Sequence, residues 1–201
     1  MIQVFSLIIL ILSVTLHEFF HGYVAYRLGD NTAKDAGRLT LNPLKHLDPI
    51  GSFFLPLTLY LVKSPFLFGW AKPVPYNPNN LRDKKYGDAK VASAGALANF
   101  GLALFSALFF RLLGPSSPAA YFLFQAVIIN ILLGVFNLLP IPPLDGSKIL
   151  AVFLPARWRF RLLTANRWWG FLLLFLLLFL GFDYLVPFVF KISFWLAGLP
   201  L

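Results

Sequence analysis

The residues best suited to chemistry lie in one short motif near the N-terminus. His17 and His21 are two of the chain's three histidines, and Glu18 between them is its only glutamate. On a helix, residues four apart lie on one face, so both imidazoles can bind one zinc ion. Glu18 is then placed to act on a metal-bound water rather than to ligate the metal. The motif indicates a metal site; the alternative is a helix whose buried polar side chains bond only to one another.

A catalytic zinc site needs a third protein ligand, and the composition limits the choice. The chain has no cysteine, so that ligand must be His, Asp or Glu. Asp145 is the leading candidate because it follows a proline-broken apolar segment, where irregular backbone is tolerated only if it is buried or lines a wet cavity. Asp183 lies near the far end of the last apolar segment, and the other aspartates fall in polar loops. His46, the third histidine, is expected to be a loop residue satisfied by hydrogen bonds.

The elements that must position these residues are apolar helices. The chain is 59% hydrophobic and 12% charged, which is typical of a polytopic membrane protein. Its net charge of +9 is explained by polar loops that face anionic lipid, and no motif points to nucleic acid. The length leaves no room for a separate soluble domain. We therefore expect one domain over residues 1–201, with its core in 1–146 and interfacial and transmembrane helices in 147–201.

Hydropathy divides the chain into spans and polar loops. We predict an all-α polytopic membrane protein with about four to six transmembrane helices. Between the first and second full spans, Phe53 to Val62 is too short to cross and suits a re-entrant segment, while the alternation around Leu39 and Leu41 suggests a short β-strand. A basic segment from Lys148 to Arg167 is expected to form an interfacial helix. The full spans are expected at Val4–Tyr26, Val91–Leu113, Ala119–Leu139 and Trp168–Phe190.

The distribution of charge predicts the topology. If Phe53 to Val62 does not cross, fifteen of the seventeen Lys and Arg residues lie on the cytoplasmic side, leaving only Arg111 and Lys191 outside. The same choice makes the first and third spans run in one direction. Each then carries its polar motif at its cytoplasmic end, so that Asp145 can meet the histidines.

Two separated motifs carry a resemblance to a known family. The sequence His17-Glu18-Phe19-Phe20-His21 is followed by a second motif, from Asn137 to Gly146, that reads NLLPIPPLDG. Together they resemble the site-2 protease family of intramembrane zinc metalloproteases. The intervening GRLTLNP and GWAKPVP segments, at 37–43 and 69–75, are similar to the compact prokaryotic branch of that family, without PDZ or CBS domains. One departure is Ala96, since the family usually shows Ala-Gly-Pro at 94–96.

The resemblance implies roles for individual residues. His17, His21 and Asp145 would bind one zinc ion per chain, Glu18 would be the general base, and Asn137 would steady the oxyanion. The alternative for Asn137 is a helix–helix hydrogen bond.

The same resemblance implies a setting and a substrate. We expect a multi-pass protein of a prokaryotic cell (inner) membrane, with its active site towards the cytoplasm and its helices in the lipid bilayer. Its substrate would be a single-span membrane protein cut within or near its transmembrane segment. Two other readings stay open, a membrane metal carrier and an inactive relative that binds membrane helices without cutting them. The sequence does not indicate the oligomeric state.

Overall fold

The computed structural model describes residues 2–62, 70–164 and 167–200. Regular structure within these residues is almost entirely helical and includes no sheet, only an isolated antiparallel bridge between Leu47 and Ala71. The elements are α1 (Ile2–Arg27), α2 (Thr32–Asp35), a 3-10 turn (Pro43–Lys45), a π-helix (Pro49–Phe54), α3 (Leu55–Leu61), a second 3-10 turn (Pro78–Asn80), α4 (Gly87–Leu113), α5 (Ala120–Asn137), α6 (Asp145–Phe153), α7 (Ala156–Leu163) and α8 (Arg167–Ala197).

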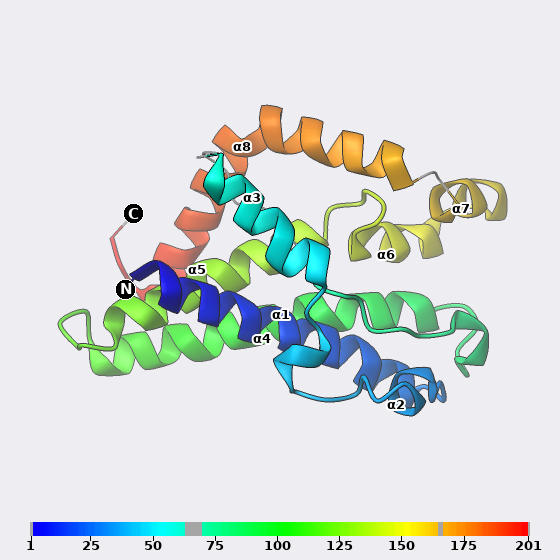
Figure 1. Ribbon diagram of the computed structural model, residues 1–201, viewed down its shortest axis with the longest axis horizontal. Helices are drawn as coiled ribbons and strands as arrows, with labels where there is room; N and C mark the ends of the chain where they lie inside the picture. The colour runs from blue at the N-terminus through cyan, green and yellow to red at the C-terminus, as the bar shows by residue number, and fades with distance from the viewer. Residues whose placement is uncertain (1, 63–69, 165–166, 201) are drawn as a thin grey trace.

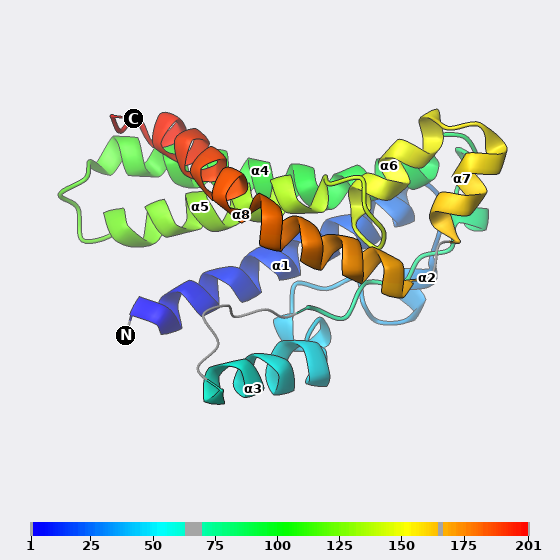
Figure 2. The same cartoon turned by 90° about the horizontal axis from the view of Figure 1, so that it is seen from above.

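Three long helices form the centre of the molecule. Helices α1 and α5 run in the same direction, and α4 runs antiparallel to both (Figures 1 and 2). Among the described residues, three helical stretches are long and apolar enough to cross a membrane: Phe5–Arg27, Gly87–Leu113 and Ala120–Asn137. The predicted parallel direction of the first and third spans is therefore present.

Local chemistry sets the limits of α4 and α5. Asp88 in the first turn of α4 and Arg111 in its last turn both suit the helix dipole. Gly114 ends α4 with a φ of 78°, a conformation that glycine adopts without strain. Helix α5 ends at Asn137, just before three prolines at 140, 142 and 143 that cannot continue it. The break turns the chain back towards α1.

Small side chains dominate the buried contacts between the central helices. Ala103 and Ala107 of α4 pack against Val127 and Ile131 of α5 and Val189 of α8. Small residues let helix backbones approach closely where lipid removes the hydrophobic drive for association. The helices are thus close enough for polar side chains to bond between them.

The segment between α1 and α4 differs from the prediction in detail. Residues 38–42 are irregular rather than a strand, because the Arg38 side chain bonds to the carbonyls of Lys72 and Pro73 and Asn42 caps the first 3-10 turn. The predicted re-entrant segment is helical, formed by the end of the π-helix and α3, and α3 stands apart from the central helices (Figure 2). Gly69 of the GWAKPVP segment lies outside the described residues.

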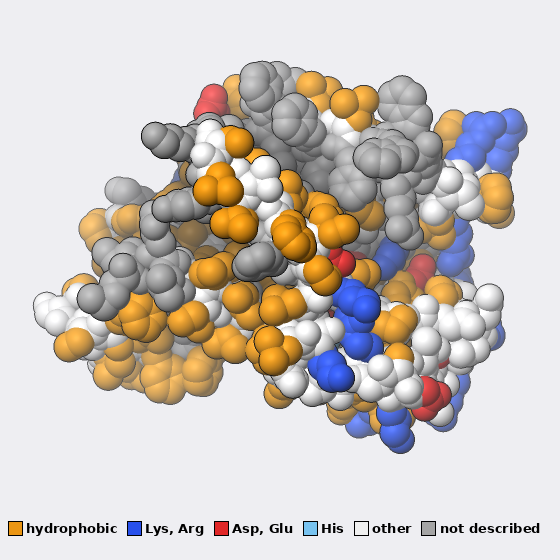
Figure 3. Space-filling model, in the orientation of Figure 1, with side chains coloured by type: hydrophobic (Ala, Val, Ile, Leu, Met, Phe, Trp, Pro, Cys, Tyr) orange, Lys and Arg blue, Asp and Glu red, His pale blue; other side chains and the backbone are white. Residues whose placement is uncertain are grey.

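The C-terminal part is also arranged differently from the expectation. The basic segment expected as one interfacial helix forms α6 and α7, which are separated at Pro155. Helix α8 then continues through Pro187 to Ala197, beyond the predicted end of the last span. On the face shown in Figure 3, Lys and Arg gather towards the end of the molecule that carries α2 and α7, and the opposite end is mostly hydrophobic.

Candidate metal centre

The two histidines of the first motif point into the molecule from α1. His17 and His21 are 6% and 7% exposed, and their Nε2 atoms lie 2.9 Å apart. Their rings meet edge to face, with centroids 4.5 Å apart. One helical turn therefore presents two imidazole nitrogens at the same point, as the spacing predicts.

Each imidazole is held at its other nitrogen by α4. His17 Nδ1 lies 2.6 Å from Asn99 Oδ1, and His21 Nδ1 lies 2.7 Å from the carbonyl oxygen of Val91. Both partners are acceptors, so each Nδ1 carries the proton and donates it, which leaves the Nε2 lone pair free. This is the tautomer that a histidine metal ligand needs, with the orientation fixed by the second nitrogen.

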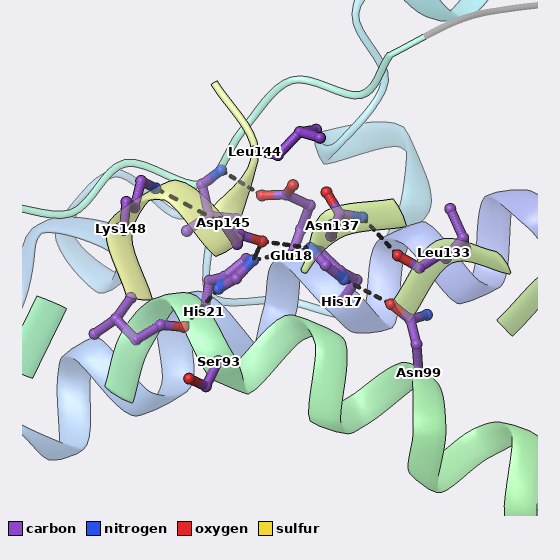
Figure 4. Close-up of polar contacts among 12 residues, drawn as sticks. His17, Glu18, His21, Ser93, Asn99, Leu133, Asn137, Leu144, Asp145 and Lys148 are labelled. Atoms are coloured by element: carbon purple, nitrogen blue, oxygen red, sulfur yellow. Dashed lines mark hydrogen bonds and ion pairs between the residues drawn. The ribbon is translucent and has the colours of Figure 1, made fainter. Parts of the chain in front are cut away.

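Asp145 completes the cluster from the first residue of α6. Its Oδ2 atom lies 3.2 Å from His17 Nε2 and 3.0 Å from His21 Nε2 (Figure 4). Gly146 permits this placement, because a Cβ there would lie 2.1 Å from the carbonyl oxygen of Leu138. Helix α6 can therefore start directly against the end of α5.

The electrostatics of the cluster favour a cation. Burial opposes ionisation of Asp145, whereas the Lys148 ammonium 3.6 Å from Oδ1 favours the charged carboxylate. Because both histidines donate their Nδ1 protons to acceptors on α4, their Nε2 atoms carry free lone pairs. These two nitrogens and Asp145 Oδ2 face one another at 2.9–3.2 Å. Ligands of a tetrahedral zinc lie about 3.3 Å apart for bonds near 2.05 Å. The donor set and its spacing therefore fit zinc.

Glu18 lies beside the cluster and takes no part in it. Its Oε2 atom accepts a hydrogen bond of 2.7 Å from the backbone N–H of Val74. The side chain is half-buried and faces a cavity of about 140 Å³ that also receives the three clustered residues. The cavity is lined by His17, Glu18, His21, Pro73, Val74, Tyr76, Asn137, Pro143, Asp145 and Lys148.

Asn137 reaches the same cavity from the last turn of α5. Its Nδ2 atom donates to the carbonyl of Leu133 in its own helix, at 3.0 Å, so the bond is within α5 rather than between helices. An amide nitrogen carries two hydrogens, and one remains for another acceptor. All five residues predicted for the site are therefore brought together around one small cavity.

A second, larger hollow lies on the outer side of α1 and α4. It has a volume of about 550 Å³, and Lys90 is its only charged lining residue. The other lining residues, such as Leu16, Phe20 and Leu97, are apolar. The Lys90 ammonium is paired with Asp83 at 2.7 Å, and the lining holds no cluster of titratable groups, so the smaller cavity is the candidate active site.

The remaining polar residues singled out from the sequence have other positions. His46 is buried and its Nε2 donates to the Thr40 carbonyl at 2.8 Å, while Asp183 is exposed on α8. Asn130 on α5 donates to Ser13 Oγ on α1 at 2.9 Å and so joins two helices. Asn99 on α4 donates to Asn130 and also accepts from His17, so it both joins helices and orients an imidazole.

Two features of the site carry no signal in the sequence motifs. Gly95 lies directly behind the imidazoles, where a Cβ would be 2.5 Å from His21 Nε2 and 2.6 Å from His17 Nε2. The Val74 N–H that holds Glu18 belongs to residues 70–76, which we call the strap.

Comparisons with known proteins find similarity to zinc metalloproteases. A profile of peptidase family M50 matches residues 112–180. YwhC of Bacillus subtilis is 40% identical over 184 residues, covering 87% of this chain and 80% of YwhC. Rip2 of Mycolicibacterium smegmatis is 33% identical over 181 residues, covering 88% and 68%. Rip2 of Mycobacterium tuberculosis is 31% identical over 192 residues, covering 94% and 71%. The names of all three relatives place them among the zinc metalloproteases, and among solved structures none matches significantly.

Proposed function

The chain belongs to peptidase family M50, and from that premise we propose that it is an intramembrane protease that cuts membrane-spanning segments of other proteins. It is an integral membrane protein and a zinc metalloprotease. The observation that carries the proposal is the convergence of His17, His21 and Asp145, with ligand atoms all within 4.8 Å, next to the carboxylate of Glu18.

Each of the residues around the cavity has its own role in peptide hydrolysis. When bound by His17, His21 and Asp145, zinc would supply a Lewis acid that lowers the pKa of a water ligand towards about 7 and polarises a carbonyl. Glu18 accepts the proton of the attacking water and returns it to the leaving amine. The second N–H of Asn137 donates to the oxygen on which negative charge develops, a contact worth roughly 100- to 1,000-fold in kcat.

The hydrogen bonds of a helix limit the form of the substrate. Within a helical segment each peptide carbonyl accepts a backbone hydrogen bond and is surrounded by side chains, which shields the scissile bond from attack. The candidate site is a small cavity of about 140 Å³ between α1, the strap and the start of α6. We therefore expect a single-span membrane protein to enter as a locally unwound, extended segment.

The charge distribution supports an orientation for the enzyme. The ends of α1 and α5 that carry the site lie with the Lys- and Arg-rich end of the molecule (Figures 1 and 3). The positive-inside rule assigns this end to the cytoplasm. We expect the protein in a prokaryotic cell membrane, with cleavage near its cytoplasmic face.

The decisive experiment is the Glu18→Gln variant. Purified wild-type and variant proteins would be incubated with a panel of single-span membrane proteins, cuts mapped by mass spectrometry, and bound zinc measured. We expect the variant to retain zinc and lose cleavage, because its amide cannot accept the proton. Asp183→Asn, the change of an exposed acid on α8, should cleave normally. Cleavage by Glu18→Gln at the wild-type rate would rule out the assigned base, and metal transport without any cleavage would favour a carrier.

A further inference from the structure

One peptide unit of the strap is bonded at both of its polar ends. The N–H between Pro73 and Val74 donates to Glu18 Oε2 at 2.7 Å, the bond drawn at Glu18 in Figure 4. The carbonyl of the same unit, on Pro73, lies 3.4 Å from Nη2 of Arg38. The same nitrogen donates to the Lys72 carbonyl at 2.8 Å. A carboxylate and a guanidinium thus lie at opposite ends of one peptide dipole.

The Arg38 guanidinium interacts with backbone carbonyls of the strap and with no carboxylate of the described residues. The Arg38 side chain is buried, 8% exposed. Its Nε atom is buried and has no hydrogen-bond partner within the same part of the chain. Away from water, a charge polarises neighbouring dipoles more strongly, so the guanidinium makes the Val74 N–H a better donor to an anion.

Within residues 73–75 of the strap, the Val74 N–H is the backbone donor that Glu18 can use. Pro73 and Pro75 have no N–H, so Val74 supplies the single backbone donor of residues 73–75. The two prolines also favour an extended backbone, and the Val74 side chain is 5% exposed. On the other side, the Lys72 N–H donates to the His46 carbonyl at 2.8 Å. The position of the donor is therefore fixed by groups on both sides of it.

We infer that Arg38 and the Val74 N–H position the general base, Glu18, through the Pro73–Val74 peptide. The N–H holds Oε2, which leaves Oε1 to receive the proton from water in the cavity. Arg38 fixes the plane of the peptide and strengthens its donor. Both are positioning residues, since neither touches the reacting atoms, and the inference rests on the function proposed above for Glu18.

The test removes the N–H while keeping the extended backbone. Val74→Pro deletes the donor at a position where proline suits the conformation, and Val74→Ala keeps the donor but shortens the side chain. With the fastest-cleaved substrate of the panel, we expect Val74→Pro to lower kcat about 10- to 100-fold at unchanged KM and zinc content. Val74→Ala keeps the N–H and should lose much less kcat than Val74→Pro. A wild-type kcat in Val74→Pro would overturn the inference.

Variants of Arg38 give an independent test should the proline variant fold poorly. Arg38→Met removes the charge with little loss of volume, and Arg38→Lys keeps a cation that can reach a carbonyl. We expect a lower kcat with unchanged KM for Arg38→Met and partial recovery for Arg38→Lys. Combining Arg38→Met with Val74→Pro should add no further loss, because both act through one peptide. Losses that multiply in the double variant would refute the shared route.

The outcome for Glu18 separates this inference from the proposed function. If Glu18→Gln is inactive while the strap and Arg38 variants keep their kcat, only the positioning role fails. If Glu18→Gln itself remains active, the assigned base fails, and the positioning role fails with it.

Discussion

The position of Gly95 predicts that a single added methyl group will disable the metal centre. A Cβ at this residue would lie 2.5 Å from His21 Nε2 and 2.6 Å from both Cε1 and Nε2 of His17, whereas ordinary contact begins at 3.4 Å. In Gly95→Ala, either α1 and α4 must separate by about 0.9 Å or the imidazoles must turn away. Separation would stretch the bonds that α4 makes to both Nδ1 atoms, and turning the rings would move the ligand atoms by more than the roughly 0.2 Å that zinc–ligand distances allow.

The structure also indicates how large the effect should be. Turning His17 or His21 away from the methyl group breaks its Nδ1 bond to Asn99 or to the Val91 carbonyl. Each broken bond leaves a buried polar group unsatisfied, at a cost of about 1–3 kcal/mol. Two such losses amount to about 2–6 kcal/mol, which weakens zinc binding at least about 30-fold at 1.4 kcal/mol per factor of ten.

The assay is a zinc titration against a competing chelator, with circular dichroism as the measure of folding. Gly101→Ala is the matched control, because it lies in α4 and a Cβ there meets no atom within 4 Å. Alanine favours a helix over glycine by about 1 kcal/mol at both sites, so propensity alone would stabilise both variants. Wild-type zinc affinity in Gly95→Ala, with normal cleavage, would show that α4 does not lie against the imidazoles as described.

Substitutions at two further residues test the groups that support the site. Asn99→Ala should weaken zinc binding by 10- to 100-fold, because the His17 Nδ1 proton loses its acceptor, and Asn99→Asp should restore much of the affinity; equal affinities of the two variants in a chelator titration would contradict this. Asp30, beyond the end of α1, accepts a hydrogen bond from the N–H of Asn77, the residue after the strap. Burial opposes ionisation of Asp30, but donors from Thr32, Asn77 and Asn80 lower its pKa from 3.8. A lowered folded-state pKa stabilises the protein above pH 3.8, and this contribution is lost as the pH falls through the folded value. Asp30→Asn should therefore reduce thermal stability at pH 7, by about 1–3 kcal/mol, and the difference from wild type should shrink below about pH 4; a difference independent of pH would contradict the role of the charge.

The meeting of the three clustered residues could be predicted from sequence because their signals are local or topological. The four-residue spacing of His17 and His21 needs only the geometry of a helix. Asp145 is 128 residues from His17, but the positive-inside rule placed both at the same end of parallel spans. In the structure, Asp145 Oδ2 lies 3.0–3.2 Å from the Nε2 atoms of the two histidines. Their role as zinc ligands remains a prediction until it is tested by substitution.

The surroundings of the ligands could not be predicted in the same way. The Val91 carbonyl and the Val74 N–H are backbone groups, and every residue type except proline offers both. Their importance depends on which side of α4 faces α1 and on the path of the strap. The apolar residues of α4 extend over much of its circumference, so hydrophobic periodicity does not select the contact face. The predicted strand near Leu39 also failed for a tertiary reason, since its neighbour Arg38 bonds to the strap.

A chain of polar side chains supplies the register that hydrophobic packing between these helices does not. Asn99 Oδ1 accepts from His17, and Asn99 Nδ2 donates to Asn130 on α5, at 2.9 Å; Asn130 in turn donates to Ser13 on α1. Leucine and alanine surfaces in lipid can slide by a turn at small cost, whereas a buried amide satisfied in only one register cannot. The bond that orients the first imidazole therefore belongs to the same network that aligns α1, α4 and α5. Precise placement of the clustered side chains and helix register are one physical requirement here, which explains how His17, His21 and Asp145 can be held together in a largely apolar chain.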